Sequence, residues 1–190
     1  MNGPARRVHD RNVLDILEAV GTRSQEGKVW RIAREGRDAT IGSAAGGRWS
    51  PTGEFEVLYT SLERDGALAE IGHRLSLEPV WPSKITHMLH QLSYRVERAL
   101  RLSNLETLRS LGVNTDRYES YEYAATQAIA AAAQFLGYDA LVVPNARHQS
   151  LNLVVIADNL DPAITLEVLS SELVDWSGWR KRARSAGRSV

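Results

Sequence analysis

The sequence predicts a single α+β domain in which a mixed or antiparallel β core is flanked by helices. Segments with helical periodicity occur beside short runs rich in β-branched residues, and three β-rich runs follow one another near the end of the chain. No linker or internal repeat divides the 190 residues, and one hydrophobic core can serve a chain of this length. We therefore expect one domain over residues 1–190, with its core at about 28–160.

The first elements expected are a helix and a strand. Residues 10–21 predict the helix, because Asp10 has the side chain of an N-cap and Gly21 follows the last apolar position. The alternation of residue types in KVWRIAR (28–34) predicts the strand. A long loop of small residues follows, and its length marks it as a candidate functional loop.

A second strand and a second helix are expected to follow directly. EVLYTS (56–61) predicts the strand. Thr60 and Glu63 have the spacing of a capping box, so a helix is expected to start there and to run to about Leu75.

The second half of the chain predicts two helices and then three strands. Residues 84–102 are ambiguous between helix and strand. Residues 103–112 predict a short helix with Ser103 and Glu106 as a capping box. The run from Tyr118 is expected to begin an alanine-rich helix that Gly137 ends. The remaining segments are three β-rich runs and a polar, basic tail: 139–144, 150–158, 164–173 and 179–190.

Composition restricts the classes of function. Lys+Arg and Asp+Glu both number 23, and this balance argues against capture of nucleic acid by bulk charge. Cysteine is absent, which excludes thiolate catalysis and cysteine metal sites. His87 and His90 could share a helix face, but two histidines without a third ligand make a weak zinc site, so we expect no metal. No apolar run resembles a signal or a membrane span, so the expected location is the cytoplasm.

Two arginines are candidates for anion binding. Arg31 lies in the middle of its predicted strand, where a half-buried charge requires a partner. That partner could be a carboxylate at the edge of the core, or a phosphate or ribose oxygen of a ligand. Arg48 follows two glycines that let the backbone approach a ligand, although taken alone it is better explained as a loop arginine that faces solvent.

Aromatic, acidic and hydroxyl side chains complete the candidate set. Tyr59 and Ser61 share a strand face, although a tyrosine in such a position is more often a core residue. Glu70 could face solvent, or it could point into a cleft and stabilise a cationic transition state, as carboxylates do in glycoside chemistry. Ser150 and Asn152 alternate onto one strand face, which indicates a lined pocket or a simple strand start with a capping hydroxyl.

The order of these residues resembles the RES-domain family, which is named for its arginine, glutamate and serine. The matching motifs are WRIAR, GGRWSPTG, VLYTS, ALAE and SLNLVV, and the resemblance covers residues 28–160. Family members are usually the toxin of a bacterial toxin–antitoxin pair, encoded beside an Xre-type antitoxin with a helix-turn-helix. Their fold is similar to that of ADP-ribosyltransferase toxins of the diphtheria type, and they bind NAD and cleave its nicotinamide–ribose bond. The resemblance therefore implies NAD as substrate without a metal, an antitoxin partner, no membrane, and nucleic acid contact only through the antitoxin.

The resemblance also implies roles for individual residues. The family's arginine, glutamate and serine fall on Arg31, Glu70 and Ser150, and its second arginine and tyrosine fall on Arg48 and Tyr59. The implied catalytic residues are Glu70, Arg31 and Tyr59. The implied NAD-binding residues are Arg31, Arg48, Tyr59, Ser61, Ser150 and Asn152.

Three functions remain open at this point. The main hypothesis is a toxin that transfers ADP-ribose to a cellular protein. The alternative is an NAD glycohydrolase or NAD phosphorylase that depletes cellular NAD. A hypothesis of another class is a non-catalytic module that binds a nucleotide or the antitoxin. The sequence does not identify the acceptor of ADP-ribose, because acceptor sites are built from loops outside the shared motifs.

Overall fold

Six strands of the described chain form one mixed sheet that closes on itself. The computed structural model describes residues 7–161 and 166–185. Along the sheet the strands are ordered β1-β2-β5-β4-β3-β6, and β1 also pairs with β3, so that five of them form a ring with β6 outside it. All pairings are antiparallel except β3 with β4. The strands are β1 (Thr22–Arg34), β2 (Val57–Ser61), β3 (His87–Arg101), β4 (Ala140–Pro144), β5 (Leu151–Ile156) and β6 (Glu167–Leu173).

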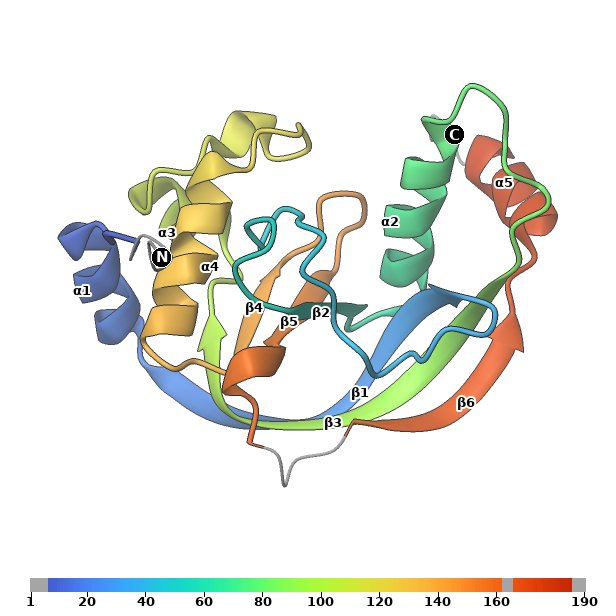
Figure 1. Ribbon diagram of the computed structural model, residues 1–190. Helices are drawn as coiled ribbons and strands as arrows, with labels where there is room; N and C mark the ends of the chain where they lie inside the picture. The colour runs from blue at the N-terminus through green and yellow to red at the C-terminus, as the bar shows by residue number, and fades with distance from the viewer. Residues whose placement is uncertain (1–6, 162–165, 186–190) are drawn as a thin grey trace, which may run out of the picture.

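Helices stand in two groups on the curved sheet, and the predicted α+β class is confirmed (Figure 1). One group contains α1, α3 and α4, and the other contains α2 and α5. Their bounds are α1 (Arg11–Val20), α2 (Arg64–Ser76), α3 (Leu105–Ser110), α4 (Ala124–Phe135) and α5 (Trp176–Ser185), with short 3₁₀ turns η1 (Thr115–Arg117) and η2 (Ala157–Asn159). None of the helices in the described part is long and apolar enough to cross a bilayer.

The two faces of the strands supply two separate apolar clusters. One cluster contains β4 and β5 side chains such as Val154 and packs against α1 and α4, where Leu17 and Ile129 are fully buried. The other consists almost entirely of strand residues such as Val29 and Leu92, as expected when strands close around their own side chains. Alternation along each strand therefore divides the core in two.

The ambiguous segment 84–102 is resolved as strand. Residues 87–101 form β3, which pairs with β1 along its length, with β6 at one end and with β4 at the other. Partners on both edges override the weak local preference. His87 and His90 therefore do not share a helix face: three positions apart on a strand, they point to opposite sides. His87 accepts a hydrogen bond from Trp176 Nε1 at 3.2 Å, and His90 Nδ1 lies 2.7 Å from the Ser171 hydroxyl.

Predicted helix ends are right where glycine decides them and wrong where a capping box was expected. Asp10 caps α1 by accepting from the Asn12 N–H at 2.8 Å, and Gly21 and Gly137 both adopt positive φ after their helices. Thr60 does not cap α2, because it is a buried strand residue whose hydroxyl donates to Leu153 O at 2.7 Å.

A correction also applies to the start of α3 and to the start of the alanine-rich helix. Asn104, rather than Ser103, caps α3 by accepting from the Thr107 N–H at 2.7 Å. Residues 118–123 precede α4 instead of forming its first turn.

The expected C-terminal tail is helical as far as the structure describes it. Residues 179–185 belong to α5, and 186–190 lie outside the described residues. Trp179 packs against α2 at Gly72, and Trp176 meets the ring of His87 edge-on at 5.7 Å between centroids. These aromatic contacts attach α5 to α2 and β3.

Candidate active site

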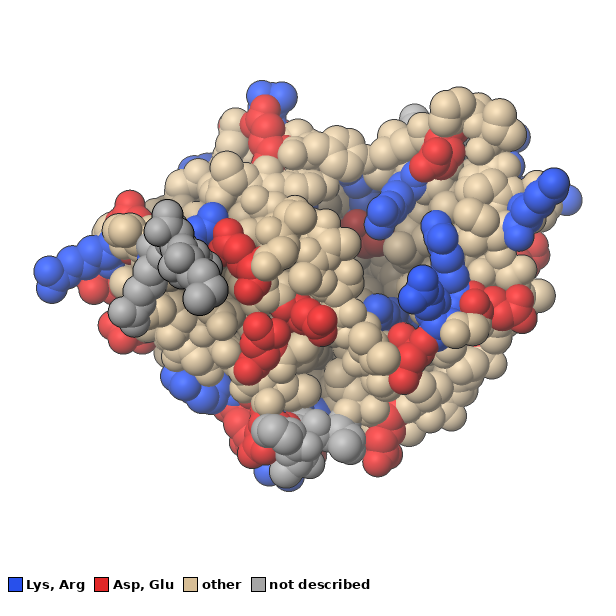
Figure 2. All heavy atoms as spheres, in the orientation of Figure 1, with Lys and Arg blue, Asp and Glu red and all other residues tan. Residues whose placement is uncertain are grey.

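A cleft of about 640 Å³ opens between α2 and the loops on the side of α4. Figure 2 shows the surface hollowed between the two groups of helices, with basic side chains near the opening. Every residue predicted to be catalytic, and every predicted NAD-binding residue except Ser150, lines this cleft: Arg31, Arg48, Tyr59, Ser61, Glu70 and Asn152. Residues that are far apart in the sequence therefore share one site.

Glu70 lies on α2 with its carboxylate fixed from one side. Oε1 accepts a hydrogen bond from the Ala146 N–H at 3.2 Å and another from Asn152 Nδ2 at 3.3 Å. Within the described residues, both hydrogen bonds to this carboxylate reach Oε1, which leaves Oε2 for a ligand. The interpretation of Glu70 as a solvent-facing residue of an amphipathic helix is therefore wrong.

Arg31 lies on β1 directly opposite His90 of β3. Burial lowers the pKa of its guanidinium to about 10, and the nearby Asp38 carboxylate acts in the opposite direction, so Arg31 is cationic at neutral pH. Its Nη1 is buried without a hydrogen-bond partner, and no carboxylate of residues 7–161 or 166–185 forms a salt bridge with it. The salt-bridge interpretation is therefore wrong, and a donor remains for an anionic ligand.

Tyr59 lines the cleft, and a hydrogen bond to its hydroxyl holds the side chain in place. The residue is 36% exposed, so it is not a core residue. Its hydroxyl accepts from the Trp49 N–H at 2.8 Å, and burial raises the pKa of the phenol. Gly47 packs on the same hydroxyl, since a Cβ there would lie 2.7 Å from it. Of the two glycines before Arg48, Gly47 thus serves the tyrosine contact.

Arg48 contacts two aromatic rings and does not simply face solvent. Its Cζ lies 4.7 Å from the ring centroid of Tyr118 and 4.8 Å from that of Tyr123. Nη2 donates to Ser120 O at 3.1 Å. Cation–π contact with two rings holds the guanidinium at the cleft wall.

Sequence reasoning missed the wall opposite α2, which we call the tyrosine segment (residues 118–123). Arg147 holds this segment from the β4–β5 loop: its Nη2 donates to Glu119 O at 2.6 Å, and its side chain is 12% exposed. Tyr121 lies across the mouth of the cleft from His73 of α2, with 3.0 Å between its hydroxyl and Nε2. The only sequence signal was the closely spaced tyrosines.

His73 is a titratable group at the cleft mouth. Burial lowers the pKa of its imidazole, the Arg147 charge lowers it further, and the Glu70 and Glu119 carboxylates oppose that shift. His73 is therefore mainly neutral at neutral pH.

Ser61, Asn152 and Ser150 differ in what their side chains contact. Ser61 lines the cleft, but its hydroxyl lies 3.4 Å from both Leu151 O and the Glu63 N–H and so supports the β2–α2 turn. Asn152 lines the cleft and contacts Glu70. Ser150 precedes β5, in the β4–β5 loop, and its hydroxyl is buried without a hydrogen-bond partner among the described residues. The structure does not bring Ser150 into the cleft lining.

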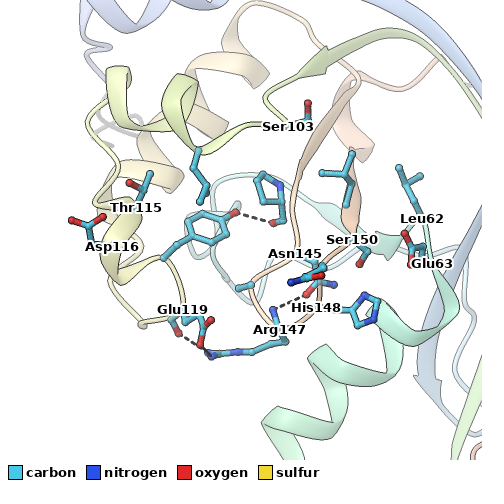
Figure 3. Close-up of a pocket in the computed structure, with 16 residues that line it drawn as sticks. Leu62, Glu63, Ser103, Thr115, Asp116, Glu119, Asn145, Arg147, His148 and Ser150 are labelled. Atoms are coloured by element: carbon cyan, nitrogen blue, oxygen red, sulfur yellow. Dashed lines mark hydrogen bonds and ion pairs between the residues drawn. The ribbon is translucent and has the colours of Figure 1, made fainter. Parts of the chain in front are cut away.

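Ser150 lines a second and larger cavity of about 1100 Å³ on the other side of the β4–β5 loop (Figure 3). This cavity is polar, with Glu63, Asp116 and His148 around it. The two cavities share Pro144, Ala146 and Arg147 as a wall. The arginine, tyrosine and glutamate of the motifs lie on the side of the smaller cleft, so chemistry rather than volume identifies the candidate site.

The residues of this cleft can bind an anion, a flat ring and a developing positive charge. They supply guanidinium groups, a partly exposed aromatic ring and a fixed carboxylate. Within residues 7–161 and 166–185, no group of three or more His, Asp or Glu side chains is arranged to hold a metal ion.

Known proteins resemble the chain in sequence and in structure. The NAD(+) phosphorylases MbcT of Mycobacterium bovis and Mycobacterium tuberculosis are 25% identical to it over 154 residues, which are 78% of this chain and 82% of the relative. A probable NAD(+) phosphorylase of M. tuberculosis is 33% identical over 100 residues, which are 53% of this chain and 48% of that protein.

The structural comparison and the family comparison agree. The crystal structure of the M. tuberculosis MbcT–MbcA toxin–antitoxin complex contains a chain that superposes with a TM-score of 0.79 and 22% identity, covering 90% of this chain and 97% of that one. That likeness shows the fold alone. A model of the RES domain matches residues 28–177, most of the chain. The chain therefore belongs to the RES domain family, as its motifs predicted.

Proposed function

We propose that this chain is a toxin enzyme that splits NAD⁺ by phosphorolysis. The bond between C1′ of the ribose and the ring nitrogen of nicotinamide breaks, and its electron pair leaves with nicotinamide. An oxygen of inorganic phosphate forms the new bond to C1′. The products are neutral nicotinamide and ADP-ribose 1-phosphate.

The observation that carries the proposal is the fixed carboxylate of Glu70 in a cleft that also holds cations and an aromatic ring. As nicotinamide leaves, the ribose acquires oxocarbenium character, and an oriented anion stabilises that state more than it stabilises the ground state. The free Oε2 of Glu70 is the atom we assign to the ribose.

The other side chains receive roles from their positions. The unpartnered donor of Arg31 is assigned to a diphosphate or ribose oxygen, with Arg48 as a second cation on the same wall. The exposed ring of Tyr59 is assigned to the nicotinamide. Oriented binding of both ends of NAD⁺ would align the scissile bond with Glu70.

The names of the relatives favour one of the hypotheses about the acceptor of ADP-ribose. Both groups of relatives are named NAD(+) phosphorylases. This naming supports the phosphorylase alternative and not the protein acceptor preferred from the sequence alone. Water remains the competing acceptor, since it reaches the same carbon.

A small antitoxin protein is the partner we propose. The support is the toxin–antitoxin complex found for a chain of the same fold. Co-expression with the protein of the neighbouring reading frame should restore the growth of cells that make this chain.

Product analysis tests the proposed reaction. Purified protein is incubated with NAD⁺ labelled on its adenylate side in three conditions: with phosphate, without phosphate, and with cell lysate. The products are then separated and identified by mass. Phosphorolysis predicts ADP-ribose 1-phosphate that requires phosphate. Free ADP-ribose in every condition would indicate hydrolysis, label on lysate proteins would indicate ADP-ribosylation, and intact NAD⁺ throughout would indicate a non-catalytic module.

The carboxylate is tested by Glu70→Gln, which keeps the shape of the side chain and removes its charge. We expect kcat to fall by about 10²–10³-fold, the loss typical of a transition-state electrostatic contact. Glu63→Gln, at the start of the same helix but on the second cavity, is the matched control and should retain activity. Equal activity in both variants would contradict the role of Glu70.

A further inference from the structure

We propose that Asn145 and Asn152 are positioning residues that orient the Glu70 carboxylate through a chain of hydrogen bonds; the inference rests on the function proposed above. Asn145 Nδ2 donates to Asn152 Oδ1 at 2.9 Å and to Gly66 O at 3.2 Å. Asn152 Nδ2 in turn donates to Glu70 Oε1 at 3.3 Å. This chain of hydrogen bonds, which we call the relay, starts at the Gly66 carbonyl of α2 and ends at the Glu70 carboxylate, one turn further along the same helix.

The orientation of each amide follows from its neighbours. An ionised carboxylate only accepts, so Asn152 must direct Nδ2 to Glu70 and Oδ1 towards Asn145. Asn145 must then donate through Nδ2, and its Oδ1 accepts from the Arg147 N–H at 2.7 Å. No flipped amide satisfies the same contacts, so the network has one hydrogen-bonding solution while Glu70 is ionised.

The relay is also built into the packing. Asn145 is 7% exposed, which makes an unpaired amide there costly. Gly66 and Glu70 are four residues apart and so lie on one face of α2. A Cβ at Gly66 would lie 3.1 Å from Asn145 Nδ2 and would collide with the Ser61 hydroxyl, so the glycine permits the close approach of the β4–β5 loop.

The consequence is a carboxylate with one oxygen occupied and the other free. Asn152 and the Ala146 N–H both hold Oε1, which directs Oε2 away from the loop. Asn152 therefore acts on the reaction through Glu70. A group of this kind changes kcat more than it changes the affinity for a ligand that carries no developing charge.

Asn152→Asp provides the first test, because it keeps shape but replaces the donor by a second carboxylate. Two close carboxylates raise the pKa of one another. The other titratable groups that face Glu70 are His73 on its own helix, Tyr118 and Tyr123 in the tyrosine segment, and Arg147 beside Ala146. All of these are the same in both proteins, so any difference reports on residue 152.

The measurement is the ¹³C chemical shift of the Glu70 carboxyl at neutral pH, assigned by its absence from Glu70→Gln. Because Asn152→Asp replaces the hydrogen-bond donor to Oε1 by an acceptor, the proposal expects this chemical shift to move in Asn152→Asp and to stay the same in Gln149→Ala. An unchanged chemical shift in Asn152→Asp would overturn the relay. This readout needs no turnover, so it tests the relay even if the protein does not cleave NAD⁺.

Kinetics supply the second test. Asn152→Ala should lower kcat at least tenfold while the Kd of ADP-ribose, measured by calorimetry, stays within about twofold. Asn145→Asp loses the donor to Asn152, so its effect should be smaller than that of Asn152→Ala, and the double variant should lose less than the product of the two single losses. Gln149→Ala, exposed on the same loop, is the control. A Kd weakened tenfold with kcat unchanged would show instead that Asn152 contacts the ligand directly and would overturn the relay.

Discussion

The two walls of the cleft are held in different ways. The α2 wall carries Glu70 and is backed by α5 through buried aromatic packing, with Trp179 on Gly72 and Trp176 on His87. The opposite wall, the tyrosine segment, has no regular secondary structure beyond its turns. Two arginines hold it: Arg48 by contact of its guanidinium with two tyrosine rings, and Arg147 by a hydrogen bond to a backbone carbonyl.

Because of this difference, contacts at one wall should affect mainly stability, and contacts at the other mainly ligand binding. The contacts behind α2 face away from the cleft, so they contribute to folding without touching a ligand. Arg48 and Arg147, which hold the tyrosine segment, line the cleft themselves. Changes behind α2 should therefore lower the free energy of unfolding, whereas changes in the tyrosine segment should mainly lower activity.

The largest effect on stability is expected from Gly72→Ala. The new Cβ would collide with the ring of Trp179, and overpacking of this kind costs about 3 kcal/mol. The better helix propensity of alanine, about 1 kcal/mol, offsets only part of that cost. Urea unfolding measures the change.

A second substitution tests the cause of that loss. Trp179→Leu gives the new methyl group room, so Gly72→Ala should cost clearly less in the Trp179→Leu background than alone. Full additivity of the two changes would show that the ring contact is not responsible.

An intermediate effect, on activity, is expected from Arg48→Ala. It removes a cation from the cleft wall together with its contacts to the rings of Tyr118 and Tyr123, so kcat/KM for NAD⁺ should fall at least tenfold, which is about 1.4 kcal/mol. The free energy of unfolding, measured in urea, should fall by less than about 1 kcal/mol, which is within the range of a partly exposed cation–π contact.

Arg48→Lys sharpens the same prediction. Lysine keeps the charge but has no planar group to stack on the two rings, so partial activity is expected. An Arg48→Ala protein that unfolds at much lower urea while retaining its kcat/KM would contradict the contrast between the walls.

The smallest effect concerns pH and His87. Burial lowers the pKa of this imidazole below 6.5, and the Arg34 charge acts in the same direction. The unfolded chain then binds the proton more tightly, so stability is fully present above about pH 6.5 and declines as pH falls towards the lower folded-state pKa. Protonation also removes the acceptor for Trp176 Nε1.

Urea midpoints at pH 8 and pH 5 measure that decline. His87→Gln retains an acceptor and cannot take up the proton, so its midpoint should depend less on pH than that of the unaltered chain. His9, His73 and His90 also have lowered pKa values and contribute equally to both proteins. The same pH dependence in both proteins would show that His87 does not cause the decline in stability.

Local signals predicted those parts of the fold that neighbouring residues decide. Gly21 and Gly137 ended their helices because positive φ is easy for glycine. The alternation of 28–34 identified part of β1 because one face of that strand is buried. The segment 84–102 stayed ambiguous because its strand state depends on partners far along the chain.

The residues of the candidate site also fall into two groups, those that the sequence motifs indicated and those that sequence reasoning missed. Motif order indicated Arg31, Tyr59 and Glu70, and all three line one cleft. Arg147 and Asn145 were missed because their importance lies in contacts with distant residues. Arg147 bonds to a carbonyl 28 residues away, and Asn145 reaches Gly66 across 79 residues.

The sequence by itself determined which chemical groups the site contains: guanidinium groups, a phenol and a carboxylate, in an order that identified the family. Only the tertiary structure decided which side of the β4–β5 loop each group faces. Alternation placed Ser150 and Asn152 on one strand face, yet β5 begins at Leu151, so the period of two does not extend to Ser150. Ser150 lines the second cavity with its hydroxyl buried, whereas Asn152 lies beside Glu70, because backbone direction in a loop is set by packing and not by local pattern.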